Sequence, residues 1–143
     1  MRRYVIDTCC LINYFGDVFG ERRRLTRPAV SLLDRAFAGQ GDVLLSIPAI
    51  AFVEVYDVRL HDAEATRRFY FDVFERVRSC GSIEIRELDS EVMRHFLAIR
   101  GALERHDRIV LACAVALNSP LITWDPKIAA YVQATGVIPG TLY

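Results

Sequence analysis

Four carboxylates lie among apolar residues at widely separated points of this sequence. They are Asp7 at the end of YVID, Glu54 within IPAIAFVEVY, Asp107 at the start of DRIVLACAVAL and Asp125 at the end of LITWD. Burying a lone carboxylate is costly unless the group is paired or coordinates a metal ion. Carboxylate oxygens suit hard cations such as Mg²⁺ and Mn²⁺. Such an ion activates water for attack on a phosphodiester without a catalytic lysine or histidine. The four acids therefore indicate metal-dependent hydrolysis if the fold brings them together.

Each acid also has a structural alternative. Asp107 could serve only as the N-cap of the helix that follows it, and Asp7 could cap the short helix after the first strand. Asp125, which precedes Pro126, could be only a turn former or a cap. Glu54 is harder to explain in this way because its neighbours are apolar, and its structural alternative is a salt bridge to an arginine. The joint placement of the four acids is more specific than any one of them and favours a shared site.

Short apolar runs alternate with helical patterns along the chain. Strands are predicted at residues 4–6, 42–46, 83–85, 120–124 and, at one edge, 137–138. Helices are predicted at residues 10–15, 28–37, from 46 or 48 to 57, 62–77, 89–103, 107–117 and 127–134. Such alternation is typical of an α/β sandwich around a mainly parallel sheet. No internal repeat or linker rich in Gly or Ser divides the sequence, so we expect one domain over residues 1–143.

The predicted elements place the four acids at one edge of the sheet. Ligands of open α/β sheets bind at the carboxyl ends of the strands, where Asp7 and Asp125 lie. A helix that follows a parallel strand begins near the same edge, and Glu54 lies about two turns into the helix after the second strand. Asp107 begins the helix that leads into the fourth strand. We therefore expect the four acids to meet in one pocket.

The composition is that of an ordinary globular protein. The 143 residues are 52% hydrophobic and 25% charged, and a chain of this length can bury a core without disulfides or structural metals. The 18 basic and 18 acidic residues balance, which argues against a protein that holds nucleic acid by bulk charge but permits a local basic groove. Every basic residue except Lys127 is an arginine. Arginine suits bidentate phosphate contacts, although a GC-rich genome would give the same bias.

The sequence favours a cytoplasmic protein without a membrane span. No apolar run approaches the roughly 20 residues that a span needs, and Asp7 and Asn13 interrupt the one stretch that resembles a signal peptide. No two cysteines form a C-x-x-C pair. The cysteines are Cys9, Cys10, Cys80 and Cys113. We expect all four to be reduced thiols packed as small hydrophobes, as in a cytoplasmic protein.

Four segments resemble the signature segments of PIN domains, in the same order and spacing. They are VIDTCCLINYF, SIPAIAFVEV, HDRIVLACAVAL and PLITWD. The likeness spans nearly the whole chain and is greatest to the VapC-type toxins of toxin–antitoxin pairs. It implies a PIN-like three-layer α/β/α sandwich with a mainly parallel five-stranded sheet. It also implies cleavage of single-stranded RNA, such as tRNA or rRNA loops, with Mg²⁺ or Mn²⁺ held mainly by Asp7, Glu54, Asp107 and Asp125.

The same resemblance implies partners and marks one departure from the family. VapC-type toxins usually form homodimers and are neutralised by a cognate antitoxin whose tail lies in the active-site groove. The family commonly has a polar residue, often Asn, where this chain has Cys9, whereas Thr8 and Thr123 keep the familiar hydroxyls. Loss of a hydrogen bond to a metal ligand weakens metal binding by roughly 10–100-fold. Two alternatives therefore stay open: a catalytically weak RNA- or protein-binding PIN module, and a PIN nuclease of RNA processing without an antitoxin.

A basic cluster between the first two predicted helices is the candidate RNA-binding surface. Its members are Arg22, Arg23, Arg24 and Arg27. The cluster could guide RNA phosphates to the acids, with Tyr14 or Phe15 as a platform on which a base stacks. The alternative is a solvated loop that only keeps the surface charged.

Two further features lie near the predicted site or on the outer surface. His106 directly precedes Asp107 and is interpreted as a surface residue near the site. The helix predicted at 62–77 carries more aromatic residues than one buried face needs. We expect part of them in the core and part in a dimer or antitoxin surface, the set being Phe69, Tyr70, Phe71 and Phe74.

Overall fold

Five parallel strands form the sheet of this structure, a computed structural model that describes residues 2–143. The strands are β1 (Arg2–Ile6), β2 (Val43–Pro48), β3 (Ile83–Arg86), β4 (Leu121–Ile122) and β5 (Thr141–Leu142). Their spatial order is β3-β2-β1-β4-β5, and every neighbouring pair is parallel. The predicted α/β class and five-stranded parallel sheet are therefore confirmed.

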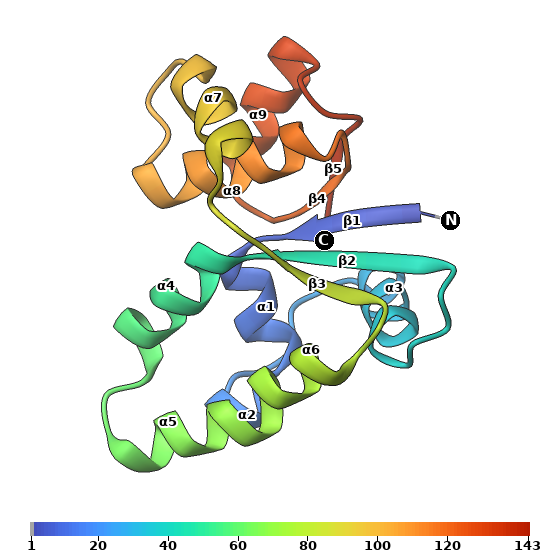
Figure 1. Ribbon diagram of the computed structural model, residues 1–143, viewed down its shortest axis with the longest axis vertical. Coiled ribbons are helices and arrows are strands. Elements are labelled where there is room, and N and C mark those ends of the chain that lie inside the picture. Colours follow the sequence, from blue (N-terminus) through green and yellow to red (C-terminus); the bar gives the residue numbers. More distant parts are fainter. Residues whose placement is uncertain (1) are drawn as a thin grey trace.

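Helices cover both faces of this sheet, which makes three layers (Figure 1). One face carries α1 (Thr8–Tyr14), α2 (Gly16–Phe19), α3 (Arg27–Phe37), α4 (Ala49–Arg59), α5 (Ala63–Phe69), the π-helical η1 (Tyr70–Phe74) and α6 (Glu75–Ser79). The other face carries α7 (Ser90–Ala98), α8 (Arg105–Ala116) and α9 (Pro126–Thr135). The helix predicted at 62–77 corresponds to α5, η1 and α6, with a π-helical turn in the middle.

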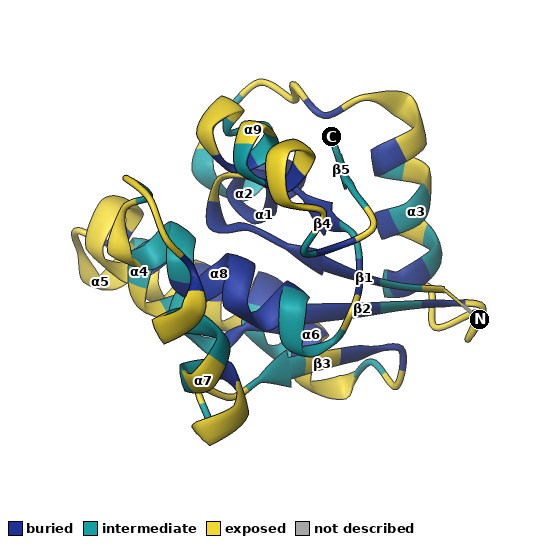
Figure 2. Cartoon of the chain, turned by 90° about the horizontal axis from the view of Figure 1, so that it is seen from above, coloured by how far each residue is buried: buried dark blue, intermediate teal, exposed yellow. Residues whose placement is uncertain are grey.

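Two apolar cores separate the sheet from its two helical layers. Tyr4 and Ile6 of β1 belong to one core, and Val5 belongs to the other, because successive side chains of a strand point to opposite faces. Helix α8 is buried along most of its length, and Figure 2 shows it as the dark centre of its layer. This confirms the prediction for a helix that is apolar on every side. No helix among residues 2–143 is long and apolar enough to cross a membrane.

The predictions for the C-terminal strands were partly wrong. Residues 137–138 do not form the edge strand, because Ile138 is needed to cover the core beneath α9. The chain reaches the sheet only at β5, where Leu121 N donates to Gly140 O at 3.1 Å and Thr123 N donates to Leu142 O at 2.8 Å. The strand predicted at 120–124 is shorter, since the chain turns after Ile122 into the cap of α9.

Three helix boundaries also differ from the prediction. Residues 46–48 continue β2 instead of opening a helix, because they pair with β3 through Pro48. Helix α7 ends at Ala98 instead of 103, since Ile99 is extended and Gly101 has a φ of +107°, which favours glycine. Helix α8 begins at Arg105, two residues earlier than predicted, so Asp107 lies inside its first turn.

Candidate active site

One cavity of about 480 Å³ brings the four predicted acids together at the carboxyl edge of the sheet. Its wall includes Asp7 after β1, Glu54 on α4, Asp107 on α8 and Asp125 before α9. Thr8, Cys9, Glu104, Trp124 and Lys127 also line it. Four segments distant in sequence therefore contribute carboxylates to the same space, as the strand ends and helix starts predicted.

Asp7 both caps helix α1 and lines the cavity. Its carboxylate Oδ1 caps α1 by accepting a hydrogen bond from Cys10 N at 2.9 Å. The residue is 6% exposed. Burial raises the pKa of Asp7, and a hydrogen bond with the Thr123 side chain partly offsets this rise. An ionised carboxylate has two oxygens with about four acceptor positions, so these hydrogen bonds leave Asp7 acceptor capacity for a ligand in the cavity.

Asp125 is also a helix cap that lines the cavity. Its Oδ1 accepts from Lys127 N at 2.8 Å at the start of α9. The backbone N–H of Asp125 donates to Thr123 Oγ1 at 3.1 Å. Thr123 therefore contacts both Asp7 and Asp125, which fixes two acids through one buried hydroxyl.

Asp107 is not a cap, so its structural alternative was wrong. The N-cap position of α8 is Glu104, and Asp107 lies in the first helical turn at the cavity wall. Burial, followed by repulsion from Asp125 and Glu104, raises the pKa of Asp107 to about 7. A bound cation would offset the repulsion that raises the pKa of Asp107.

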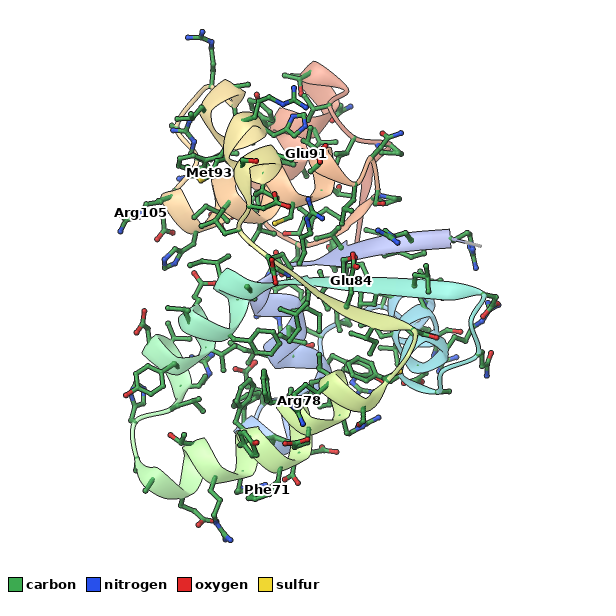
Figure 3. All side chains as sticks on the ribbon, in the orientation of Figure 1. Phe71, Arg78, Glu84, Glu91, Met93 and Arg105 are labelled. Carbon is green, nitrogen blue, oxygen red and sulfur yellow. The ribbon has the colours of Figure 1, made fainter. Side chains whose placement is uncertain are left out.

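Glu54 pairs with a histidine, not with an arginine as its structural alternative supposed. Its Oε2 lies 2.9 Å from His106 Nδ1, and both side chains are half-buried. His106 thus lies near the site as expected, but it is half-buried instead of fully on the surface. Only its position beside Asp107 signalled its role, since Glu54 reaches it across the contact of α4 with α8. The preceding residue, Arg105, projects outward instead, at the left of Figure 3.

Cys9 is exposed at the cavity wall, so the expectation that every cysteine packs as a small hydrophobe was wrong for this one. Partial desolvation and then the carboxylates, Asp7 first, raise the pKa of the Cys9 thiol to about 11. Cys10 and Cys113 are buried as expected, and Cys80 is half-buried. All four thiols are free. Thr8, the other neighbour of Asp7 in this wall, is buried.

The donor set suits a divalent hard cation. Four acidic residues and Thr8 line one cavity, and Mg²⁺ binds oxygen ligands while keeping several waters, with one or two carboxylates sufficient. Among residues 2–143, no group of three or more His, Cys, Asp or Glu side chains lies close enough together to hold a metal ion directly. The residues therefore fit a partly hydrated ion that carboxylates from separate elements share.

The structure separates the members of the basic cluster. None of the four lines the cavity, and Arg24 comes nearest through Trp124, a residue of the cavity wall whose ring its guanidinium covers. Arg23 donates to Tyr14 O, Arg27 begins α3, and Arg22 is exposed. The stacking role expected of Tyr14 or Phe15 was wrong, because both rings are buried. They pack against Phe37 in the core.

The aromatic residues of α5 and η1 divide between core and surface, as expected. Phe69 is buried, and Phe74 is half-buried against Phe52. Tyr70 and Phe71 are exposed, and Phe71 lies on the outer side of η1, at the lower edge of Figure 3. Both line a second cavity together with Tyr56.

Comparisons with known proteins agree with this fold. A solved structure, titled as the crystal structure of VapBC2 from Rickettsia felis bound to a DNA fragment from their promoter, is similar with a TM-score of 0.64. The likeness covers 99% of each chain at 13% sequence identity, which shows a shared fold. No match was found among curated proteins. The sequence model of the PIN domain matches residues 4–133, and this chain therefore belongs to the PIN domain family.

Proposed function

We propose that this protein is a metal-dependent endoribonuclease that cleaves single-stranded regions of RNA, such as tRNA or rRNA loops. The observation that carries the proposal is the cavity where Asp7, Glu54, Asp107 and Asp125 meet. PIN family membership adds support, because the four acids stand in the segments that resemble the family's signatures. When bound, Mg²⁺ or Mn²⁺ supplies an activated water and neutralises charge on the scissile phosphate.

In this proposal some side chains bind the ion and others orient the side chains that bind it. Asp7 and Asp107 bind it directly in this proposal, and Glu54 and Asp125 complete the site as ligands or through waters. Thr123 orients Asp7 and Asp125, and His106 orients Glu54. Thr8 supports the site from the cavity wall. We expect products with a 5′-phosphate and a 3′-hydroxyl, as the family resemblance implies.

We further propose that the protein is the cytoplasmic toxin of a type II toxin–antitoxin pair. The support is the fold shared with a chain of a VapBC2 structure and the likeness of the sequence motifs to VapC-type toxins. The exposed aromatic side chains of Tyr56, Tyr70 and Phe71 line one cavity and offer an apolar surface to an antitoxin or to a second copy of the chain. A homodimer is part of this proposal.

The decisive experiment is cleavage of total RNA and bulk tRNA by the purified protein with Mn²⁺ or Mg²⁺. EDTA and the Asp107→Asn variant serve as controls. Discrete fragments that need the metal and vanish in the variant would establish the nuclease, and their ends would identify the target. Cleavage that persists in EDTA or in Asp107→Asn would contradict the assignment of the acids.

A binding module is the second candidate, and Cys9 in the cavity wall is the observation that favours it. Isothermal calorimetry with Mn²⁺ separates the two. Absence of both cleavage and Mn²⁺ binding would favour the module. Clear Mn²⁺ binding without cleavage would mean that the RNA tested was the wrong substrate. Co-purification with the product of a neighbouring small gene would distinguish a toxin from a PIN nuclease of RNA processing.

A further inference from the structure

Residues 22–26 form the segment before α3 that carries Arg24, and one buried side chain holds this segment in place. Asn13 is fully buried, and its Nδ2 donates to Arg22 O at 2.9 Å. Its Oδ1 accepts from Arg24 N at 2.7 Å and from Leu25 N at 3.1 Å. Figure 2 shows the segment before α3 as exposed except at Leu25. An exposed segment with a fixed backbone can present side chains to a ligand at low entropic cost.

The neighbouring contacts fix the same segment further. A Cβ on Gly16 would lie 2.5 Å from Glu21 O, so the segment rests closely on the start of α2. At its other end, Thr26 Oγ1 donates to Tyr143 O. The Tyr143 ring meets the Trp124 ring edge-on, with centroids 6.3 Å apart. The segment and the indole are thus fixed relative to each other by contacts that do not involve the Arg24 side chain.

The Arg24 side chain is the exception in this ordered region, since it has an aromatic partner but no anionic one. Its guanidinium carbon lies 4.6 Å from the centroid of the Trp124 ring. Within residues 2–143, the guanidinium makes neither an ion pair nor a side-chain hydrogen bond. By contrast, Arg23 stacks on Tyr14 and also donates to its carbonyl oxygen. The donors of Arg24 are therefore available beside a cavity rich in carboxylates.

A phosphodiester strand needs cations next to this cavity, because the carboxylates repel it wherever a metal ion does not neutralise them. Lys127 lies in the cavity wall and is exposed. Arg24 stacks on Trp124, which belongs to the same wall. Guanidinium groups stack on aromatic faces while donating in their own plane, and they bind phosphate well. Stacking on Trp124 thus holds a phosphate-binding group at the edge of the site without tying up its donors.

We propose that Arg24, positioned by Trp124, binds a phosphate of single-stranded RNA next to the scissile one. This inference rests on the proposed function, since it assigns a substrate contact to the same site. It selects one arginine from the basic cluster and replaces the expected aromatic platform of Tyr14 or Phe15 by Trp124. Trp124 acts here as a positioning residue, because its role is to hold the guanidinium.

The test measures RNA binding without cleavage. The protein carries Asp107→Asn, and the probe is a fluorescein-labelled single-stranded RNA of mixed sequence, about 12 nucleotides long, with Mg²⁺ and with EDTA. We expect Arg24→Ala to weaken binding about tenfold, since a charge-assisted hydrogen bond to phosphate is lost. The slope of log Kd against log salt should fall by about 0.7, the value for one phosphate contact to a single strand. Arg94→Ala is the matched control, because Arg94 is exposed, makes no ion pair within residues 2–143 and lies outside the cavity wall.

The role of Trp124 is tested by a double-mutant cycle and by rescue. Trp124→Leu should weaken binding, and Arg24→Ala should add less than twofold in that background, since both changes remove one contact. Trp124→Phe keeps an aromatic face and should restore most of the affinity. Trp124 is the only tryptophan, so its emission in the Arg24-containing protein should change when unlabelled RNA binds.

The outcomes separate this inference from the proposed nuclease. Equal affinities of Arg24→Ala and Arg94→Ala, an unchanged salt slope, or no RNA binding with or without Mg²⁺ would overturn the role of Arg24. Additive effects of the two substitutions would overturn the positioning role of Trp124. RNA binding that depends on Arg24, in a wild-type protein that neither cleaves total RNA nor binds Mn²⁺, would overturn the nuclease and leave this inference standing.

Discussion

His106 Nδ1 lies 2.9 Å from Glu54 Oε2, which joins the first turn of α8 to the middle of α4 beside the carboxylate cavity. The pair explains how a glutamate can be held on a helix whose neighbouring residues are apolar. The contact also fixes Glu54 from the helix that carries Asp107, so the two acids are positioned relative to each other.

Replacing His106 should therefore weaken metal binding more than it weakens the fold. We expect His106→Ala to lower Mn²⁺ affinity by roughly 10–100-fold, the usual effect of removing a residue that orients a metal ligand. Calorimetric titration with Mn²⁺ measures this effect. His61→Ala is the control, because His61 is exposed and its ring, among residues 2–143, makes a single hydrogen bond, with Val58 O. Equal Mn²⁺ affinities for the two variants would contradict the orienting role.

Asp107→Asn should raise the stability of the metal-free protein above neutral pH. The folded pKa of Asp107 is about 7, against 3.8 for the free side chain. Between these values the folded state binds more protons than the unfolded state, so the contribution of Asp107 to stability falls as pH rises from about 4 to 7 and then stays low. The variant should gain about 1 kcal/mol at pH 8, a value discounted because solvent screens this half-exposed group.

Urea unfolding in EDTA at several pH values measures this gain. The difference between variant and wild type should vanish below about pH 3, under the free value of 3.8, where Asp107 is protonated in both states. A variant that is less stable at pH 8, or a difference that does not depend on pH, would show that Asp107 is not strained by its neighbours.

Metal affinity should rise with pH for the same reason. A cation must displace the proton from Asp107, so Mn²⁺ affinity should increase by up to about tenfold per pH unit below 7 and level off above it. Calorimetry between about pH 5.5 and about pH 8, a range that includes the Asp107 pKa of about 7, measures this change in Mn²⁺ affinity. In Asp107→Asn the affinity should be lower and its pH dependence weaker. A wild-type affinity that is constant over this range would contradict a metal role for Asp107.

The positions of the acids could be predicted because parallel strands end at a common edge. Asp7 follows β1 and Asp125 comes shortly after β4, two neighbouring strands, so their proximity followed from the strand assignment alone. The helix that carries Asp107 begins two residues before the predicted start. An apolar run marks the buried part of a helix and says little about its first turn.

The contacts around the acids could not be predicted in the same way. Glu54 meets His106 only because α4 and α8 pack beside the sheet edge, and Arg24 meets Trp124 only because Asn13 fixes the path of an irregular segment. Neither contact has a periodic signal in the sequence. The predicted strand at 137–138 failed for a related reason: Ile138 is apolar because it covers the core, not because it joins the sheet.

Cys9→Asn should strengthen metal binding. The Cys9 thiol has a pKa of about 11 and stays neutral beside the carboxylates at physiological pH, where it is only a weak hydrogen-bond donor. An amide at this exposed wall position is a strong donor to a metal-binding carboxylate, so we expect Mn²⁺ affinity to rise about tenfold. Cys9→Ala serves as the control, since it removes the thiol without supplying a donor. Equal Mn²⁺ affinities for the two variants would show that this wall position does not influence the ion.

Asn13→Ala should destabilise the protein and release the segment that carries Arg24. The substitution removes three hydrogen bonds and leaves the buried Leu25 N–H without its partner. We expect a loss of about 2 kcal/mol, typical of a buried polar network broken on one side, measured by urea unfolding. Trp124 emission should shift in the direction seen for Arg24→Ala, because the guanidinium leaves the indole. Gln40→Ala is the control, since Gln40 is exposed and its side chain makes no hydrogen bond within residues 2–143. A stability loss no larger than that of the control would mean that the segment holds its conformation without Asn13.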